Sequence, residues 1–589
     1  MNTTRRMCAG RPRLLLSALL LLASSASAQD AYQYPSKVNV AWNRLYDFDE
    51  VTQICRDLAT AYPDLLTLTS IGKSVQGRDI WLITLNVAKT GKDTEKPAMY
   101  IDGNIHGNEA QAAETVLYSI WYLTKSYGKV EQLTQLMDRS AFYFIPMVNP
   151  DGRAYWFAKA NTSSSSRGGQ KPTDDDGDGL FDEDPPNDLD GDGWLLQMRK
   201  EDPNGRWRES ANDPRILEMI PPDAKGEFKR FTRYFGGEGL DDDGDGDVNE
   251  DGPGGYDPNR NWPADWQPEY IQGGSGDYPL SLPESKCIAD FILAHPNIAA
   301  VQSYHNAAGM MLRGPGAEYV DYPQQDVAVY DRIGQRGERI LPLYTYSVIY
   351  RDLYTVHGGF INWTAEDLGI ISFTNELWTG RKYYYEKEEA ARGAEAQTAQ
   401  MDFNDLLLFG QTFVPWKKFK HPVYGDVELG GWVKMQGRVP PSFQLEDECH
   451  RNFAFTMFHA EHMPLVEITN VDVTPLGGGL SRVRADLKNT RIIPTTTGQG
   501  ARRRYGPRDR VEIAGTGLEV VAGGFIGPDR YTTPFSFVAH QPVRLWLDNG
   551  VPGEGVRSVQ WLVRGAGDAT IRFTGPRART VEAKVRLAP

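Results

Sequence analysis

The sequence predicts an α/β protein with a largely parallel or mixed sheet, followed by a C-terminal all-β sandwich. Two observations support this. From Tyr34 onward, amphipathic segments alternate with short apolar runs, as in a sheet that is covered by helices. After about Leu465, short alternating runs separated by Gly- and Pro-rich turns replace that pattern.

The elements of the α/β part follow in order along the chain. An amphipathic helix is expected over 48–62, where Pro63 ends it, and a second from near Glu109 to about Tyr127. Strands are expected at 80–87, 98–102, 142–148, 298–304 and 370–377. Ligands of such sheets commonly bind at the carboxyl ends of the strands, so polar residues there are candidates for a site.

The bulk properties limit the choice of function. A chain of 589 residues suggests two or three folded units. The formal net charge of −15 and a pI near 5.2 argue against a nucleic acid or an anionic membrane surface as the main partner.

The first 28 residues are typical of a secretory signal. Basic residues precede the apolar run Leu14–Leu22, and Ala26-Ser27-Ala28 fits a cleavage site that leaves Gln29 first. The apolar run is too short for a stable membrane span. The sequence therefore predicts an exported, soluble protein, either periplasmic or extracellular.

Three cysteines remain after removal of this segment, so at most one disulfide can form within the chain. Small core residues are the favoured interpretation of Cys55 and Cys287, which lie in helical patterns.

Four polar residues stand where predicted strands end or a helix begins. His106 and Glu109 follow the strand 98–102, His305 ends an apolar run, and Glu376 closes another. Imidazole and carboxylate suit zinc, and three protein ligands with an open position mark a catalytic site. The pair His106-x-x-Glu109 alone is weak evidence for a zinc site. His305 and Glu376, which are distant in the sequence, strengthen it.

Several ordered motifs make the chain resemble the zinc carboxypeptidase A family. They are HGNEAQAAET from His106, VNPDGR from Val148, YDPNRNW from Tyr256, QSYHN around His305, and FTNEL around Glu376. The resemblance spans about 34–410. It implies an eight-stranded sheet sandwiched by helices, a zinc ion on His106, Glu109 and His305, and hydrolysis of a C-terminal peptide bond.

The resemblance also implies the catalytic roles. Glu376 takes a proton from the water at the zinc and passes it to the leaving amine. Arg199 is similar in position to the arginine that stabilises the oxyanion, with Arg206 and Arg208 as nearby competitors.

Substrate-binding roles follow in the same way. Asn259 and Arg260 resemble the pair that binds the terminal carboxylate, and Tyr354 the tyrosine that closes over it. Asp257 resembles the carboxylate that orients a zinc histidine, most simply His106. Ile361 lies at the specificity position, where an apolar residue implies hydrophobic C-terminal residues.

The signal pattern, the family resemblance and the change of pattern after Leu465 together divide the chain into three parts. They are a signal at 1–28, a catalytic domain at 29–464 with acidic loop insertions at about 160–252, and a β-sandwich accessory domain at 465–589. Between 149 and 259 the helix–strand pattern stops, and the sequence predicts long surface loops. His459-Ala-Glu-His462 resembles a metal motif, but a surface or packing role is favoured.

Three Asp-Gly tracts in the insertions are typical of the openings of calcium loops, in which alternate oxygen ligands precede a turning glycine. None has the usual Glu at position twelve, so they are not ordinary EF-hands. A structural Ca²⁺ is preferred over a solvated acidic loop. Its candidate ligands are Asp174, Asp176, Asp178, Asp188, Asp190, Asp192, Asp241, Asp243 and Asp245.

Two alternatives remain at this point. Relatives in this family include enzymes that cut peptidoglycan stem peptides, so a cell-wall amide hydrolase is one. A non-catalytic binding protein on the same scaffold is the other, although the zinc ligands and Glu376 are all present. The oligomeric state and the purpose of the β-sandwich are open.

Overall fold

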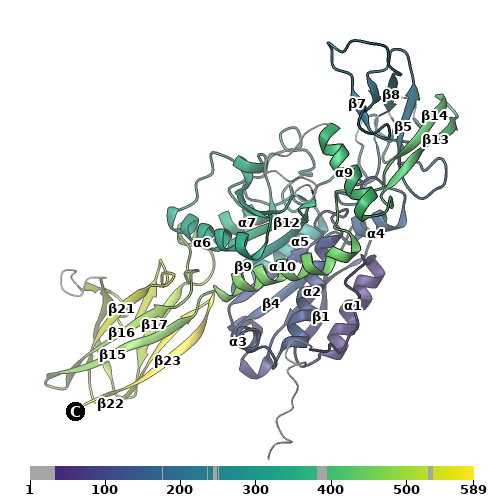
Figure 1. Ribbon diagram of the computed structural model, residues 1–589. Helices are drawn as coiled ribbons and strands as arrows, with labels where there is room; N and C mark the ends of the chain where they lie inside the picture. The colour runs from purple at the N-terminus through teal and green to yellow at the C-terminus, as the bar shows by residue number, and fades with distance from the viewer. Residues whose placement is uncertain are drawn as a thin grey trace, which may run out of the picture.

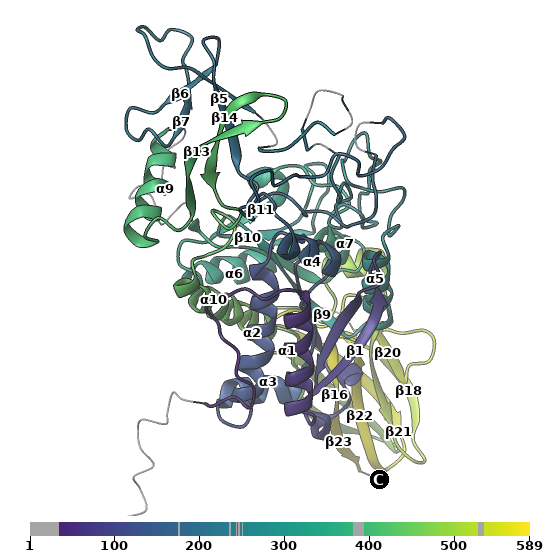
Figure 2. The ribbon, with the colours of Figure 1, turned by 90° about the vertical axis from the view of Figure 1, so that its right-hand side faces the viewer.

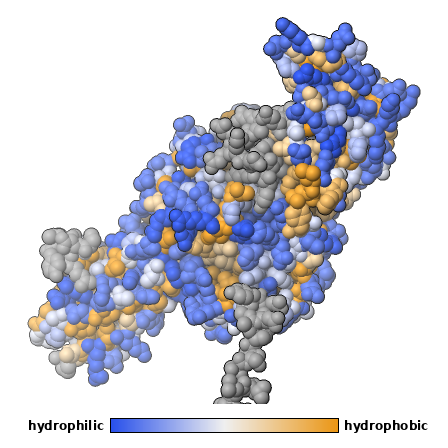
Figure 3. Space-filling view, viewed as in Figure 1, coloured by the Kyte–Doolittle hydropathy of each residue, from blue (hydrophilic) through white to orange (hydrophobic). Residues whose placement is uncertain are grey.

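The computed structural model describes residues 34–174, 177–234, 237–242, 244, 248–249, 251–380, 394–527 and 535–588. The predicted signal at 1–28 lies outside these ranges, as do Asp176, Asp243 and Asp245 of the acidic tracts. Within them, no helix combines the length and the apolar character that a membrane span needs. Hydrophilic side chains cover most of the face shown in Figure 3.

A mixed eight-stranded sheet forms the centre of the molecule (Figure 1). Its order is β1 (Leu66–Lys73), β2 (Asp79–Leu85), β4 (Ala141–Ile145), β3 (Ala98–Gly103), β9 (Ile298–Asn306), β12 (Ile371–Leu377), β10 (Met310–Arg313) and β11 (Thr345–Val348). The inner strands β4, β3, β9 and β12 run parallel, whereas β2 and β10 join them antiparallel. The predicted α/β fold with a mixed sheet is confirmed.

Helices bury both faces of this sheet. One face packs against α1 (Phe48–Ala61), α2 (Gln111–Ser126), α3 (Glu131–Arg139), α6 (Gln324–Ile340) and α10 (Ser442–Glu461). The other packs against α5 (Pro283–Ala294) and α7 (Phe360–Glu366). Strand β3 shows the reason, because Met99 and Ile101 join one core cluster while Ala98 and Tyr100 join the other. A strand that is apolar on both faces must be covered on both.

The insertion is more ordered than the sequence predicts, since four of its segments are strands. They join a six-stranded sheet whose order is β13 (Phe413–His421), β14 (Gly425–Trp432), β5 (Gln197–Glu201), β8 (Phe231–Tyr234), β6 (Trp207–Glu209) and β7 (Leu217–Met219). Met198 of β5 is buried against Val427 and Leu429 of β14. The partners are far apart in sequence, so no local pattern revealed this sheet. It stands apart from the central sheet in Figure 2.

Two sheets follow α10 and pack face to face. One has the order β15 (Val466–Gly477), β16 (Leu480–Asn489), β21 (Val556–Arg564), β18 (Glu519–Ile526) and β19 (Ser536–Phe537). The other has the order β20 (Arg544–Leu547), β17 (Asp509–Ala514), β22 (Gly567–Gly575) and β23 (Ala578–Leu587). Their inward side chains form one cluster that includes Val483, Val511, Trp561 and Phe573. This is the predicted sandwich.

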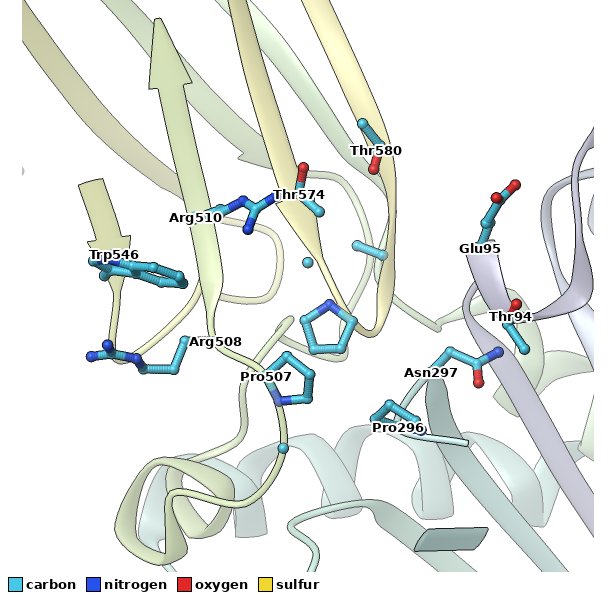
Figure 4. A pocket seen from close by; sticks show the side chains of 14 residues that line it. Thr94, Glu95, Pro296, Asn297, Pro507, Arg508, Arg510, Trp546, Thr574 and Thr580 are labelled. Carbon is cyan, nitrogen blue, oxygen red and sulfur yellow. The ribbon is translucent and has the colours of Figure 1, made fainter. Parts of the chain in front are cut away.

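The sandwich is attached to the segment between α7 and β12. Arg577 donates hydrogen bonds of 2.7 Å to the carbonyl oxygens of Leu368 and Gly369. A cavity of about 530 Å³ lies beside this junction, lined from both units by residues such as Asn297, Arg510 and Trp546 (Figure 4). The C-terminal unit therefore supports the segment that connects α7 to β12, the strand that contains Glu376.

The structure also bears on the expectations for His459 and for the cysteines. His459 is buried with its ring edge-on to Phe373, and burial lowers its pKa to about 3. The burial of His459 against Phe373 supports the packing role. Cys55, Cys287 and Cys449 are all free thiols.

Candidate metal centre and active site

The predicted metal ligands lie at one edge of the central sheet, where parallel strands end. His106 follows β3, Glu109 lies just before Ala110, the N-cap of α2, and His305 is in β9. In the parallel pairing of β9 with β12, His305 is the partner of Glu376. The fold thus brings four residues from three separate strand ends to one place.

The three ligands contact one another through metal-binding atoms. The two carboxylate oxygens of Glu109 lie 2.9 Å from His106 Nδ1 and 3.0 Å from His305 Nδ1. The two Nδ1 atoms are 3.2 Å apart. Two imidazole nitrogens and a carboxylate that converge on one point are a donor set that zinc prefers. The residues present therefore fit a zinc ion.

Close backbone packing makes this convergence possible. The loop of His106 continues through Gly107, where a Cβ atom would lie 2.4 Å from the carbonyl carbon of Gly152. No larger residue fits at this contact between the His106 motif and the start of α4 (Pro150–Ala158).

Charged neighbours hold both carboxylates of the centre ionised. Burial alone raises the pKa of Glu109, but His106 and His305 outweigh it and bring the value well below its usual range. Asp257 Oδ1 lies 3.0 Å from His106 Nε2, the ring nitrogen that faces away from Glu109. Burial also opposes ionisation of Asp257, and Arg260, His106 and Arg167 lower its pKa well below the usual range. The carboxylate of Asp257 can thereby fix the orientation of the His106 ring.

Glu376 lies beside the metal ligands, as the strand partner of His305. Burial, and after it the charge of Glu109, raise its pKa above the ordinary value. It lines the same pocket as His106 and His305. A carboxylate with a raised pKa at such a place can accept a proton and give it up again.

Arg167 lies beside the metal ligands and Arg199 does not, so the expectation for Arg199 is wrong. Arg167 lines the pocket, and its guanidinium contacts Asp257 Oδ2 at 3.3 Å and Glu109 Oε1 at 3.4 Å. The backbone of its loop is fixed on both sides, because Gly107 N donates to the Arg167 carbonyl and Gly169 N to that of Tyr256. Burial lowers the pKa of Arg167, but Asp257 and Glu109 reverse this and raise it overall.

Arg199 lies instead in β5 of the six-stranded sheet. It donates to Glu428 Oε2 at 2.7 Å and Glu209 Oε1 at 3.1 Å, and its guanidinium packs over the rings of Phe231 and Trp416. These pairings make it a structural residue of that sheet. Its competitor Arg208 is also paired, with Glu218. The sequence signal for Arg167 is its place in Arg-Gly-Gly, between the VNPDGR motif and the acidic tracts.

The residues predicted to bind a substrate terminus line the same pocket. Arg260 Nη2 lies 3.4 Å from the Tyr354 hydroxyl, which it can reach as a donor. The Asn259 side-chain oxygen accepts from Phe360 N at 2.9 Å, which orients the amide. Tyr354 is 49 % exposed, so its ring can change position without disturbing the core.

Apolar walls form the rest of the pocket. Ile361 of α7 faces it, together with Leu312, Val356 and Thr374. Among the described lining residues, Glu376 is the only carboxylate.

No described residue of the acidic tracts lines this pocket. Asp174, Asp178 and Asp241 accept hydrogen bonds from backbone N–H groups of their own turns. Asp188, Asp190 and Asp192 gather with Glu238, a residue that the sequence pattern did not suggest.

A family model described as zinc carboxypeptidase matches residues 51–219 and 224–400, which is more than half of the chain. A second model, for a domain of unknown function, matches 465–586. Rat (Rattus norvegicus) carboxypeptidase A1 is 23 % identical over 374 residues, which cover 61 % of this chain and 68 % of that protein.

Other matches are shorter or more distant. Rat carboxypeptidase D is 29 % identical over 161 residues, 27 % of this chain and only 12 % of that protein. A crystal structure of carboxypeptidase A from Helicoverpa armigera has 17 % identity and a TM-score of 0.41, covering 73 % of this chain and 77 % of that one.

Proposed function

The chain belongs to the zinc carboxypeptidase family, and from this premise we propose a secreted metallocarboxypeptidase that removes hydrophobic C-terminal residues from peptides or proteins. The observation that carries the proposal is the convergence of the zinc donors, Glu376 and the Arg260–Tyr354 pair on one pocket. A metal with open coordination beside a site for a terminal carboxylate is what an exopeptidase needs.

Zinc on His106, Glu109 and His305 supplies a Lewis acid that polarises the scissile carbonyl and favours ionisation of water. Two side chains of the pocket then have separate catalytic roles. The Glu376 carboxylate accepts the proton of the attacking water and then protonates the leaving amine. The guanidinium of Arg167 donates to the oxygen on which negative charge develops.

Binding of the substrate terminus falls to residues on the other side of the pocket. The planar Arg260 guanidinium can donate two hydrogen bonds to a terminal carboxylate. Asn259 adds a donor amide, and the exposed Tyr354 ring closes over the bound residue. These contacts hold the scissile bond at a fixed distance from Glu376.

Ile361, Leu312 and Val356 support the preference for hydrophobic C-terminal residues. A lysine or arginine side chain there would lose its hydration without gaining a carboxylate partner of its own, which costs free energy.

A panel of N-blocked dipeptides tests this function. We expect kcat/KM for substrates that end in Phe or Leu to exceed that for Arg or Lys by about 10-fold or more. Equal rates on basic and hydrophobic termini would contradict the pocket assignment. Faster release from a γ-D-glutamyl-diaminopimelate substrate would instead indicate a peptidoglycan hydrolase.

Export is supported by the basic, apolar and small-residue order of the first 28 residues. We expect the mature protein to begin at Gln29, with mass spectrometry of the protein collected outside the cytoplasm as the measurement. An intact N-terminus in a cytoplasmic fraction would contradict secretion. Calcium in the acidic tracts has no part in this reaction and is a separate proposal.

A further inference from the structure

One acidic tract is folded around its first carboxylate. The DLDGDG loop, residues 188–193, immediately precedes Trp194 and β5. Asp188 accepts hydrogen bonds from Gly191 N at 2.8 Å and Gly193 N at 2.9 Å. Both glycines have positive φ, 72° and 88°, which allows the chain to wrap so tightly. The loop therefore turns its aspartates towards one centre.

A fourth carboxylate reaches this centre from another part of the chain. Glu238 follows β8, the neighbour of β5 in the six-stranded sheet. Its Oε1 accepts from Leu196 N at 2.8 Å, and its own N–H donates to the Leu196 carbonyl at 2.8 Å. Glu238 is thus held rigidly against the chain that leaves the loop.

The second oxygen of Glu238 lacks a partner. The side chain is 0 % exposed, and within the described part of the chain Oε2 makes no hydrogen bond. A buried carboxylate oxygen left in this state costs free energy. Ligand atoms of Asp188, Asp190, Asp192 and Glu238 all lie within 4.8 Å of one another. The buried Glu238 carboxylate therefore lies close to three aspartate carboxylates.

From this geometry we propose that Asp188, Asp190, Asp192 and Glu238 bind one structural Ca²⁺. All four donors are carboxylates, and Ca²⁺ takes six to eight oxygen ligands in flexible geometry. Zinc prefers nitrogen and sulfur donors, which this group lacks, and Mg²⁺ keeps most of its water. Glu238 supplies the distant acid that the sequence pattern of the loop does not contain.

Burial and mutual repulsion act on two of these carboxyl groups. Burial, followed by the charges of Asp190 and Asp188, raises the pKa of Glu238 to about 7. The same causes raise the pKa of Asp192. Like charges this close repel, and a divalent cation removes the repulsion.

The ion would join the entry of β5 to the exit of β8. These strands pair antiparallel, with Met198 opposite Tyr234. One cation at that end would hold the two strands together without touching the zinc ligands, which lie in β9 and in the loop between β3 and α2. We therefore expect calcium to stabilise the protein while leaving its chemistry unchanged.

The test uses the full-length, zinc-loaded enzyme, freed of other divalent cations and titrated with CaCl₂ in a calorimeter. Glu238→Gln keeps the shape of the buried side chain, and Asp190→Asn changes an exposed ligand that cannot disturb the core. Glu227→Gln, an exposed position in the same insertion, is the matched control. Zinc content is measured for every variant.

For the wild type and Glu227→Gln we expect calcium binding and a higher midpoint of thermal unfolding. Glu238→Gln and Asp190→Asn should each lose about one site, or bind it at least about 10-fold more weakly. Terbium luminescence excited through tryptophan gives a local readout, because Trp194 N donates to Asp192. Wild-type stoichiometry and affinity in both ligand variants would overturn the proposal, as would no binding by the wild type at millimolar Ca²⁺.

Discussion

Glu376→Gln is expected to lower kcat/KM by between about 10² and 10⁴-fold while zinc content stays at the wild-type level. Glutamine keeps the size of the side chain but cannot take a proton from water. Glu376 is absent from the set of three mutually contacting metal donors, so the substitution leaves those donors in place. Steady-state kinetics on an N-blocked dipeptide, together with metal analysis, measure both quantities.

Glu366→Gln is the matched control for this loss. Glu366 is also a buried carboxylate, and it accepts a hydrogen bond from the Tyr322 hydroxyl at 3.3 Å. Burial raises its pKa to about 8, so it is largely neutral near pH 7 and a neutral amide resembles it. We expect Glu366→Gln to retain wild-type kcat/KM. Undiminished turnover by Glu376→Gln would remove the basis of the proposed chemistry.

Arg167→Ala is expected to lower kcat by about 10²- to 10³-fold, the usual effect of removing one donor to a developing oxyanion. KM should change much less, because the interaction strengthens as charge appears on that oxygen. Arg167 also contacts Glu109 and Asp257, so metal content must be measured beside the kinetics.

Arg199→Ala separates the two arginine assignments. Arg199 is buried and paired with Glu428 and Glu209, so its loss should lower the unfolding midpoint. Below that temperature, kcat and KM should match the wild type. A fall in kcat for Arg199→Ala with none for Arg167→Ala would restore the assignment drawn from the sequence.

The sequence predicted most of the central fold because its signals are local. Strand β3 was expected at 98–102 and is found at Ala98–Gly103, and helix α1 was expected over 48–62 and is found at Phe48–Ala61. Apolar periodicity and a terminating proline are properties of neighbouring residues, so they can be recognised without the fold. His106, Glu109, His305 and Glu376 were recognisable because each follows or closes such a run.

The insertion shows where this local information ends. Strand β5 contains Arg199 and only one residue of the small core cluster, Met198, whose partners lie in β14. A five-residue strand with a distant partner has no periodicity of its own to detect. The six-stranded sheet and the structural role of Arg199 therefore became visible only once the two segments were paired.

What the sequence alone determined about this protein is its class, a zinc carboxypeptidase scaffold with an appended β-sandwich, and four candidates for its active site, His106, Glu109, His305 and Glu376. Only the tertiary structure decided that Arg167 stands beside Glu109, and that Glu238 joins the aspartates of the 188–193 loop. The physical reason is the same for both. Arg167 and Glu238 both lie inside the long insertion, far along the chain from the residues that they contact, and spacing along the chain does not encode which backbones pair across it.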